Sequence, residues 1–349
     1  MRVDTFIFLI FIFVGILMLM FVVSLSEAIH VVEWKTIISL FYLMAIVNVL
    51  KDLKFLDYVS LIVIKHSSRI FITLIALTLI LSMLITNDVV LFVIVPLTLI
   101  LFKYIEADKK DLEKLIIFEG ISANIGSGLT PIGNPQNIFL YHFYNIDAFE
   151  FVKNMVPFEI FGILVILPFM EFRKYNCKID VDVEFKKEWI IYLIIFMLIL
   201  LCIFGFLNFI YVFPIILAVI LIKKPKIDYL FLLTFIFLFV DVYGIKKLGI
   251  INLFNVVNND VMLMIYSSLL SQIISNVPAT VLLSNIYDNW LPIAYGVNVG
   301  GNGTLISSFA NLITLRLSNR EVSVVRFLLI GMIIYIMHLT ALTLYLKIF

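Results

Sequence analysis

Cysteine and histidine are scarce in this chain of 349 residues, and neither is clustered. Of the two cysteines, Cys177 lies in a polar stretch and Cys202 inside an apolar run, so the pair predicts neither a disulfide framework nor a thiolate metal site. The four histidines are far apart in sequence: His30, His66, His142 and His338. We therefore expect no transition-metal centre, and nothing else in the sequence indicates a cofactor.

Charge is also scarce. Charged residues form 14% of the chain and the net charge is +1, without a basic patch interleaved with aromatic residues, so no nucleic-acid partner is expected. Neither a catalytic aspartate pair nor a His-Glu-x-x-His segment is present, so we do not expect an enzyme. Apolar residues form 63% of the sequence and the mean hydropathy is +1.15, which excludes a soluble globular domain. The expected partner is the lipid bilayer, with the chain crossing the cell membrane several times.

Apolar runs of spanning length are separated by short charged turns, which predicts an all-α polytopic membrane protein. The run at 55–66 is short, and it is either a span or an interfacial helix. If it crosses, we expect about ten crossings, at 6–26, 34–50, 55–66, 115–143, 153–170, 189–208, 210–222, 228–245, 291–317 and 322–346. In that case 17 of the 25 Lys and Arg residues fall on one side of the membrane, and the N-terminus lies outside on the other.

Two further segments, 69–104 and 260–288, are too long for one span and carry polar residues at their centres. Thr86-Asn87-Asp88 interrupts the first segment, and Ser275-Asn276 with Val277 interrupts the second. We interpret each segment as a re-entrant hairpin whose tip lies near the membrane midplane.

A segment rich in Gly and Pro, 124–138, lies inside one of the predicted spans. This composition breaks the helical hydrogen-bond ladder, so the break must be buried in protein or line a wet cavity. The pattern recurs at 298–312, where identical residues stand 174 positions apart: Asn124 and Asn298, Gly126 and Gly300, Thr130 and Thr304, Ile132 and Ile306, Asn137 and Asn311. Duplicated broken helices are the best sequence indication of a transporter's binding site.

A polar linker at 171–188 lies at the centre of the chain. We therefore expect two transporter repeats, 1–174 and 175–349, within one membrane domain. An odd number of crossings in each half turns the second repeat upside down relative to the first. The predicted fold is two inverted repeats, each with a re-entrant hairpin and a broken transmembrane helix.

Hydroxyl and amide side chains gather at the two predicted tips. Each tip has two hydroxyls four residues apart, which places them on one helix face, and then an asparagine: Ser82, Thr86 and Asn87 in the first half, Ser271, Ser275 and Asn276 in the second. With freed backbone carbonyls these oxygens suit a hard cation such as Na⁺, and opposed helix N-termini suit an anion. A single Ser or Thr in a membrane helix more often serves packing, but two matched sets favour binding.

The pattern resembles the large ion-transporter superfamily that contains the arsenical-pump permeases, the citrate–metal symporters and the divalent anion:sodium symporters. The resemblance covers nearly the whole chain and rests on Ser82-x-x-x-Thr86-Asn87-Asp88, the Thr-Pro-Ile-Gly-Asn-Pro-Gln-Asn segment at 130–137, Ser271-x-x-x-Ser275-Asn276, and the segment 300–311. These motifs are specific to the superfamily and not to a substrate.

The resemblance implies two cation sites with the substrate between them. One cation site would use Ser82, Thr86, Asn87 and the Gly133 carbonyl, and its counterpart Ser271, Ser275, Asn276 and the Ser307 carbonyl. The substrate would lie near Asp88, Asn134, Pro135, Val277 and Ser308. We also expect that the chain can form a homodimer.

Asp88 and Val277 stand where the dicarboxylate branch has a Thr after each tip Asn. A carboxylate beside a dianion is repulsive, so the chain looks closer to the arsenical-pump branch. Intramembrane carboxylates are costly and functional by default, so Asp88 is either a coupling group for a proton or cation, or a helix N-cap. We interpret Glu119 and Asp241 as residues at span boundaries or in helix packing.

The sequence thus predicts a secondary active transporter for a small inorganic or organic anion, an arsenite-like oxyanion or a carboxylate, coupled to H⁺ or Na⁺ as symporter or antiporter. One alternative is a cation/proton antiporter of the same superfamily. Another is a channel, which would need no coupling sites.

Overall fold

The structure is a computed structural model that describes residues 3–65, 69–102, 108–174 and 185–348. Within these ranges the chain forms 17 α-helices, two short 3-10 helices and no strand, as the sequence predicts. Four helical segments are long and apolar enough to cross a membrane: α3 (Trp34–Asp52), α9 (Ala148–Ile166) continued by η1 (Leu167–Phe169), α12 (Tyr229–Lys247) and α17 (Val324–Ile348).

The other helices are shorter or less apolar over the described residues, and several of them pair into hairpins or broken helices. They are α1 (Val3–Phe21), α2 (Leu25–Val31), α4 (Phe55–Lys65), α5 (Ile70–Leu84), α6 (Asn87–Leu101), α7 (Lys109–Ser127), α8 (Pro135–Phe143), α10 (Glu188–Ile203), α11 (Phe209–Lys223), η2 (Ile250–Phe254), α13 (Asp260–Ile274), α14 (Asn276–Ser284), α15 (Trp290–Gly300) and α16 (Phe309–Leu317).

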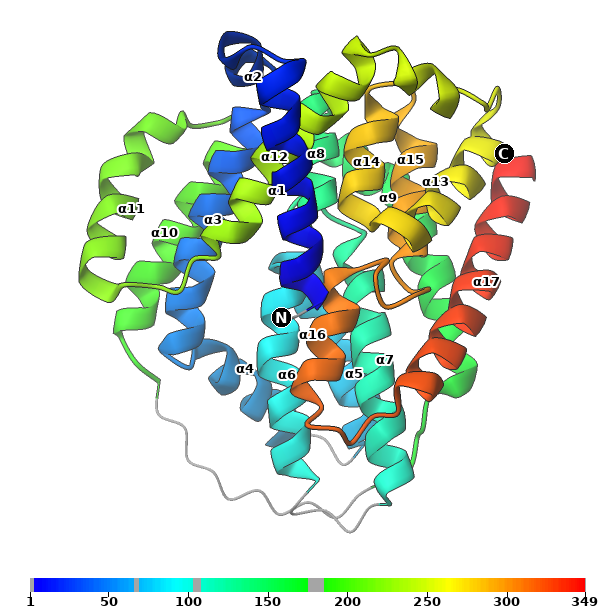
Figure 1. The fold of residues 1–349 in the computed structure, drawn as a ribbon. Helices are drawn as coiled ribbons and strands as arrows, with labels where there is room; N and C mark the ends of the chain where they lie inside the picture. Colours follow the sequence, from blue (N-terminus) through cyan, green and yellow to red (C-terminus); the bar gives the residue numbers. More distant parts are fainter. Residues whose placement is uncertain (1–2, 66–68, 103–107, 175–184, 349) are drawn as a thin grey trace.

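Two helical hairpins enter the molecule from opposite ends and meet near its middle (Figure 1). The α5/α6 hairpin opens toward the end that carries Lys110 and Arg326, which we call the basic end. The α13/α14 hairpin opens toward the other end. Its turn is tight, because Ser275 alone separates the two helices and adopts a positive φ of 75°.

Each predicted broken helix consists of two short helices joined by an unwound segment. Asn134 caps α8 by accepting a hydrogen bond from the Asn137 amide at 2.9 Å, and Ser308 caps α16 through the Ala310 amide at 3.3 Å. Pro135 follows Asn134 at the first helical position, where no amide hydrogen is needed. The α7–α8 pair runs away from the basic end and the α15–α16 pair runs toward it (Figure 1).

Glycine lets each broken helix contact the first arm of its hairpin. A Cβ atom at Gly126 on α7 would lie 2.3 Å from the Leu79 carbonyl oxygen of α5. A Cβ atom at Gly296 on α15 would lie 2.3 Å from the Met264 carbonyl oxygen of α13. Any side chain at either position would push the hairpin away from the broken helix, so the two glycines set the position of both tips.

Of the two alternatives for 55–66, the structure favours the interfacial helix over the crossing, and residue 66 lies outside the described residues. Helix α4 rises only about 16 Å, against a hydrocarbon core of about 30 Å. Phe55, the first residue of α4, packs with its ring centroid 5.5 Å from that of Trp189. Trp189 lies just after the central linker at 171–188. Beyond its other end, α5 starts near Lys114, whose ammonium lies 5.5 Å from the Phe71 ring. Both ends of α4 therefore lie at the basic end (Figure 1).

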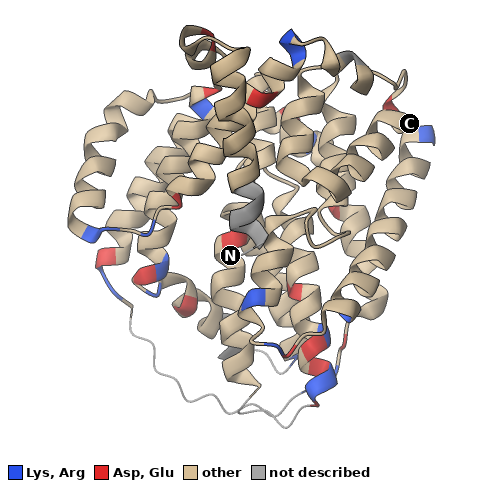
Figure 2. Cartoon of the chain, in the orientation of Figure 1, with Lys and Arg blue, Asp and Glu red and all other residues tan. Residues whose placement is uncertain are grey.

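This position of α4 changes the predicted arrangement of the first spans. Lys51, in the last turn of α3, and Lys54, between α3 and α4, lie at the basic end rather than opposite it (Figures 1 and 2). Helix α1 runs away from the basic end (Figure 1), which reverses the predicted direction of the first span. The predicted position of the N-terminus, opposite the basic clusters, rested on a count of crossings. Without a crossing at α4, that count no longer gives this placement.

A polar contact fastens α2 to α12 at the end of the molecule opposite the basic end. The Glu27 carboxylate accepts a hydrogen bond from the Ser24 amide at 2.8 Å and one from Lys247 at 2.9 Å. The Ser24 amide, together with Lys247, lowers the pKa of Glu27 to about 2. The Glu27 carboxylate in this contact therefore stays ionised throughout the physiological pH range.

Cysteine labelling tests this arrangement. Lys110→Cys and Asp52→Cys should react with an impermeant thiol reagent from one side of the membrane, and Lys246→Cys from the other, because all three positions are exposed and only Lys246 lies opposite the basic end. The readout is mass-tagging in right-side-out and inside-out vesicles. Reaction of Asp52→Cys together with Lys246→Cys would restore the crossing at 55–66 and refute this arrangement.

Candidate functional site

The first tip is joined to the unwound segment of its own broken helix. The backbone amide of Asn87 donates to the Gly133 carbonyl at 3.0 Å, and the Thr130 hydroxyl donates to the Met83 carbonyl at 2.6 Å. Ser82 is fully buried, and its hydroxyl has no hydrogen-bond partner among the described residues. The first hairpin thus contains a buried hydroxyl without a hydrogen bond, and its tip holds a backbone carbonyl in place.

The second tip repeats these contacts with one difference. The Asn276 amide donates to the Ser307 carbonyl at 2.9 Å. Ser275 donates to the Asn276 side-chain oxygen at 3.4 Å. The Ser271 hydroxyl, which matches Ser82, donates to the Ser267 carbonyl at 2.8 Å. The hydroxyl that is free at the first tip is therefore occupied at the second.

The structure joins two predicted members of each cation set. Gly133 meets Asn87 at the first tip and Ser307 meets Asn276 at the second. Each carbonyl oxygen accepts one amide hydrogen bond and keeps a second lone pair. Hydroxyl, amide and carbonyl oxygens are the donors that a hard cation prefers. The unpartnered Ser82 hydroxyl makes the first set the better fit for such an ion.

Four asparagines connect the two halves of the chain. Asn124 of α7 donates to Asn311 of α16 at 2.9 Å, and Asn298 of α15 donates to Asn137 of α8 at 2.9 Å. These bonds are the same contact made twice, because Asn124 matches Asn298 and Asn137 matches Asn311 in the duplication. We call these four residues the asparagine network.

Two predicted substrate residues, Asn134 and Ser308, are hydrogen-bonded to this network. Asn134 donates to the Asn298 side-chain oxygen at 2.9 Å, and Ser308 donates to the Asn124 side-chain oxygen at 2.9 Å. Both are almost fully buried, with 1% and 2% of their surface exposed. In this conformation they hold the broken helices together and do not face a cavity.

The sequence prediction did not assign the asparagine network to any site. Its four positions are two identical pairs 174 residues apart, and that identity was the available signal. The side chain of Asn137 also donates to the carbonyls of Ser127, Gly128 and Thr130, each at 3.1 Å. The amides therefore satisfy backbone groups that the unwound segment leaves free.

A cavity of about 1020 Å³ leads from the basic end to the first tip, and we call it the basal cavity. Thr86, Asp88 and Pro135 line it at the first tip. Its other polar lining residues come from α3, from the turn before α12 and from α16: Asn48, Lys51, Lys226, Asp228 and Arg316. Three basic and two acidic side chains thus surround one path into the molecule.

Asp88 lies in the first turn of α6 and lines the basal cavity. The N-cap of this helix is Thr86, so the predicted capping role of Asp88 is wrong. The Asp88 carboxylate has no hydrogen bond to any described residue. Its position beside the helix N-terminus stabilises negative charge there.

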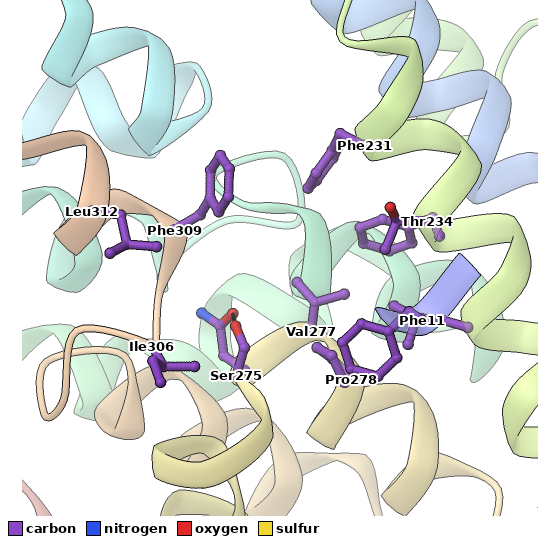
Figure 3. A pocket seen from close by; sticks show the side chains of 12 residues that line it. Phe11, Phe231, Thr234, Ser275, Val277, Pro278, Ile306, Phe309 and Leu312 are labelled. Atoms are coloured by element: carbon purple, nitrogen blue, oxygen red, sulfur yellow. Dashed lines mark hydrogen bonds between the residues drawn. The ribbon is translucent and has the colours of Figure 1, made fainter. Parts of the chain in front are cut away.

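A second cavity, of about 50 Å³, lies against the second tip, and we call it the tip cavity (Figure 3). Ser275, Asn276 and Val277 line it, together with apolar residues that include Phe11, Phe235 and Leu238. The predicted substrate residues are thus divided, since Asp88 and Pro135 face the basal cavity and Val277 faces the tip cavity.

Glu119 and Asp241 do not lie at span boundaries. Glu119 of α7 is fully buried and accepts a hydrogen bond from Thr98 of α6. Asp241 of α12 is 4% exposed, and neither of its oxygens has a partner among the described residues. Their burial leaves helix packing as the part of that prediction that fits the structure.

Comparison with known proteins gives consistent matches. A family model described as citrate transporter matches residues 5–289. An uncharacterized transporter of Methanocaldococcus jannaschii is 69% identical over all of this chain and 99% of its own length. The inner membrane protein YbiR of Escherichia coli is 31% identical, covering 82% of this chain and 81% of its own length. A Dictyostelium discoideum protein named as an arsB transporter is 28% identical over 44% of this chain and 28% of its own length.

The asparagine network should contribute measurably to stability. Asn298→Ala removes a buried amide and leaves its partners unsatisfied, which we expect to cost about 1–3 kcal/mol. Combined with Asn137→Ala, it should show a coupling energy of about 0.5–3 kcal/mol. The measurement is thermal unfolding of the purified protein in detergent.

The matched control is Asn154→Ala, whose side chain bonds only within its own helix, to the Glu150 carbonyl at 3.0 Å. This change should stay within about 0.5 kcal/mol of the parent. Full additivity of Asn298→Ala and Asn137→Ala would show that the bond across the two halves carries no stability.

Proposed function

Because the chain belongs to the citrate transporter family, we propose that this membrane protein is a secondary active transporter for a small anion, an arsenite-like oxyanion or a carboxylate, coupled to H⁺ or Na⁺. The observation that carries the proposal is the basal cavity, which connects basic side chains to the first tip. The resemblance to transporters supports this reading over an enzyme.

The charges along the basal cavity favour an anionic substrate. Lys51, Lys226 and Arg316 come from three different parts of the chain and line one cavity. Like charges that converge on a path with low-dielectric walls raise the local concentration of the opposite ion. An anion that enters then meets Asp88 beside the first tip, so its binding depends on how the Asp88 charge is neutralised.

The tips supply the coupling sites in this proposal. Ser82, Thr86, Asn87 and the Gly133 carbonyl would hold one Na⁺, and the equivalent groups of the second tip another. Proton coupling would use Asp88 instead, since Asp88 lines the basal cavity and its carboxylate has no hydrogen bond to a described residue. In both cases the cation compensates the charge of the anion.

We further propose that the fold comprises two inverted repeats with nine crossings. In this topology α3 corresponds to α12 and α1 to α11, because α11 lies beside α3 and α1 beside α12. The Tyr42 hydroxyl donates to the Phe209 carbonyl, and a Cβ atom at Gly15 would lie 2.3 Å from the Phe237 ring. Inverted repeats of this kind let a transporter expose one site to either side in turn.

The alternative is a cation/proton antiporter, and the position of Asp88 favours it specifically. A carboxylate that lines a cavity and lacks a hydrogen bond can bind a proton or a cation in turn. The two functions differ in whether an anion binds. Thermal-shift measurements across oxyanions, carboxylates, Na⁺ and pH would identify a ligand, and saturable counterflow in proteoliposomes would then exclude a channel.

Removal of a cavity charge should weaken anion binding. Arg316→Gln should raise the KM for the identified anion about tenfold, equivalent to about 1.4 kcal/mol, because one of three basic groups in the cavity is lost. Arg320→Gln, which removes the same charge at the same end but outside the cavity lining, should leave KM unchanged. Equal effects of both changes would mean that the cavity does not bind the anion.

Replacement of Asp88 separates proton coupling from Na⁺ coupling. Asp88→Asn preserves shape and removes the titrating group, so it should abolish proton-driven accumulation while substrate exchange survives. Asp228→Asn is the matched control, because Asp228 lines the same cavity and an Asn can keep its bond to the Phe231 amide. The measurement is accumulation against pH in proteoliposomes. An unchanged profile in Asp88→Asn would leave Na⁺ coupling at the tips.

A further inference from the structure

Two phenylalanines separate the basal cavity from the tip cavity. Phe231 of α12 and Phe309 of α16 line both cavities, and Leu312 completes the shared wall. Figure 3 shows their side chains on either side of the space above Val277. The wall between the two cavities is therefore formed by side chains alone, without a helix between them.

The two rings contact each other across two parts of the fold. Their centroids are 6.1 Å apart and their planes are inclined by 42°. Phe231 is fixed from behind by the Phe235 ring at 5.1 Å and through its amide by Asp228 at 2.9 Å. Phe309 is the first residue of α16 and directly follows Ser308, which belongs to the surroundings of the asparagine network. A shift of α16 relative to α12 would part the rings.

The wall divides the proposed binding site. Thr86 and Asp88 of the first tip lie on its basal side, and Asn276 and Val277 of the second tip lie behind it. An anion in the basal cavity reaches the first tip but cannot touch the Asn276 side chain while the rings are in contact. The contact is apolar, so opening it breaks no hydrogen bond between the two rings.

The two halves differ at this position. Pro135 stands 174 residues before Phe309, at the matching first position of α8, and it also lines the basal cavity. Proline leaves the first tip open to that cavity, whereas the phenylalanine closes the second. The difference in side-chain size therefore explains why the basal cavity reaches the first tip but not its counterpart.

We infer that the Phe231–Phe309 contact is an internal gate that controls whether substrate from the basal cavity reaches the second tip. The inference rests on the proposed function, since it assumes that a ligand enters through the basal cavity. Phe231 and Phe309 are thus positioning residues, which decide when both tips can contact one ligand.

A cysteine reporter behind the gate tests this directly. Thr234 is 3% exposed and lines only the tip cavity, so Thr234→Cys is introduced into the full chain with Cys177→Ser and Cys202→Ala. An impermeant thiol reagent is added from the basic end in oriented vesicles. Phe231→Ala should accelerate the modification about tenfold or more, because it increases the population of open gates.

Two controls isolate the gate from general loosening. Phe92→Ala removes a phenylalanine that lines the basal cavity but not the shared wall, and it should change the rate by less than about twofold. Met44→Cys, a reporter on the basal side, should react at the same rate in all backgrounds. If Phe231→Ala does not fold, Phe309→Leu serves as the second opening variant.

The inference is overturned if Thr234→Cys reacts as fast as Met44→Cys in the parent protein, or if neither opening variant accelerates it. The labelling requires no transport. If the protein transports no anion, the proposed function is refuted, but the labelling rates still test the gate.

Discussion

Backbone hydrogen bonding in a medium without water is the constraint on which this structure depends. Each unwound segment frees amide and carbonyl groups that lipid cannot satisfy. The Asn137 side chain donates to three of these carbonyls. The Asn311 side chain donates to the carbonyls of Gly301 and Thr304, at 2.8 and 2.9 Å. Since the same two asparagines accept the bonds from the other half, the groups that make the helix breaks tolerable also join the two repeats.

Much of this arrangement could be predicted from sequence because it is local. The hydroxyl spacing and the Gly and Pro content fixed the hairpins and the breaks. The hydrogen bonds between the two halves could not be predicted. Identity at a spacing of 174 reveals a duplication, but it does not show whether Asn124 bonds Asn137 of its own half or Asn311 of the other. The sequence leaves the choice between a span and an interfacial helix at α4 open for a different reason. Hydropathy detects an apolar run, whereas crossing depends on length and on where the ends are held, and Trp189 holds one end of α4 at the basic end.

The two tips are not equivalent, although one contact to the unwound segment is shared by both. Thr130 bonds the Met83 carbonyl and Thr304 bonds the Gln272 carbonyl, which is the same contact in both halves. At the second tip the Gln272 side chain adds two bonds, to the Thr304 amide at 2.7 Å and the Gly300 carbonyl at 2.8 Å. The first tip has methionine at this position. The first tip therefore lacks these two added bonds, and it is also the tip that faces the basal cavity.

The charges of the basal cavity connect binding to coupling. In the proposed function the basic side chains attract an anion, which must then come close to the Asp88 carboxylate in the same cavity. Anion binding and Asp88 ionisation therefore oppose each other. Binding becomes favourable when a proton neutralises Asp88 or when a cation occupies the oxygens of the neighbouring tip. Linkage makes this reciprocal, so the anion in turn strengthens binding of the proton or cation. Coupling in this proposal thus needs no dedicated relay, because it follows from placing one carboxylate between a cation site and an anion path.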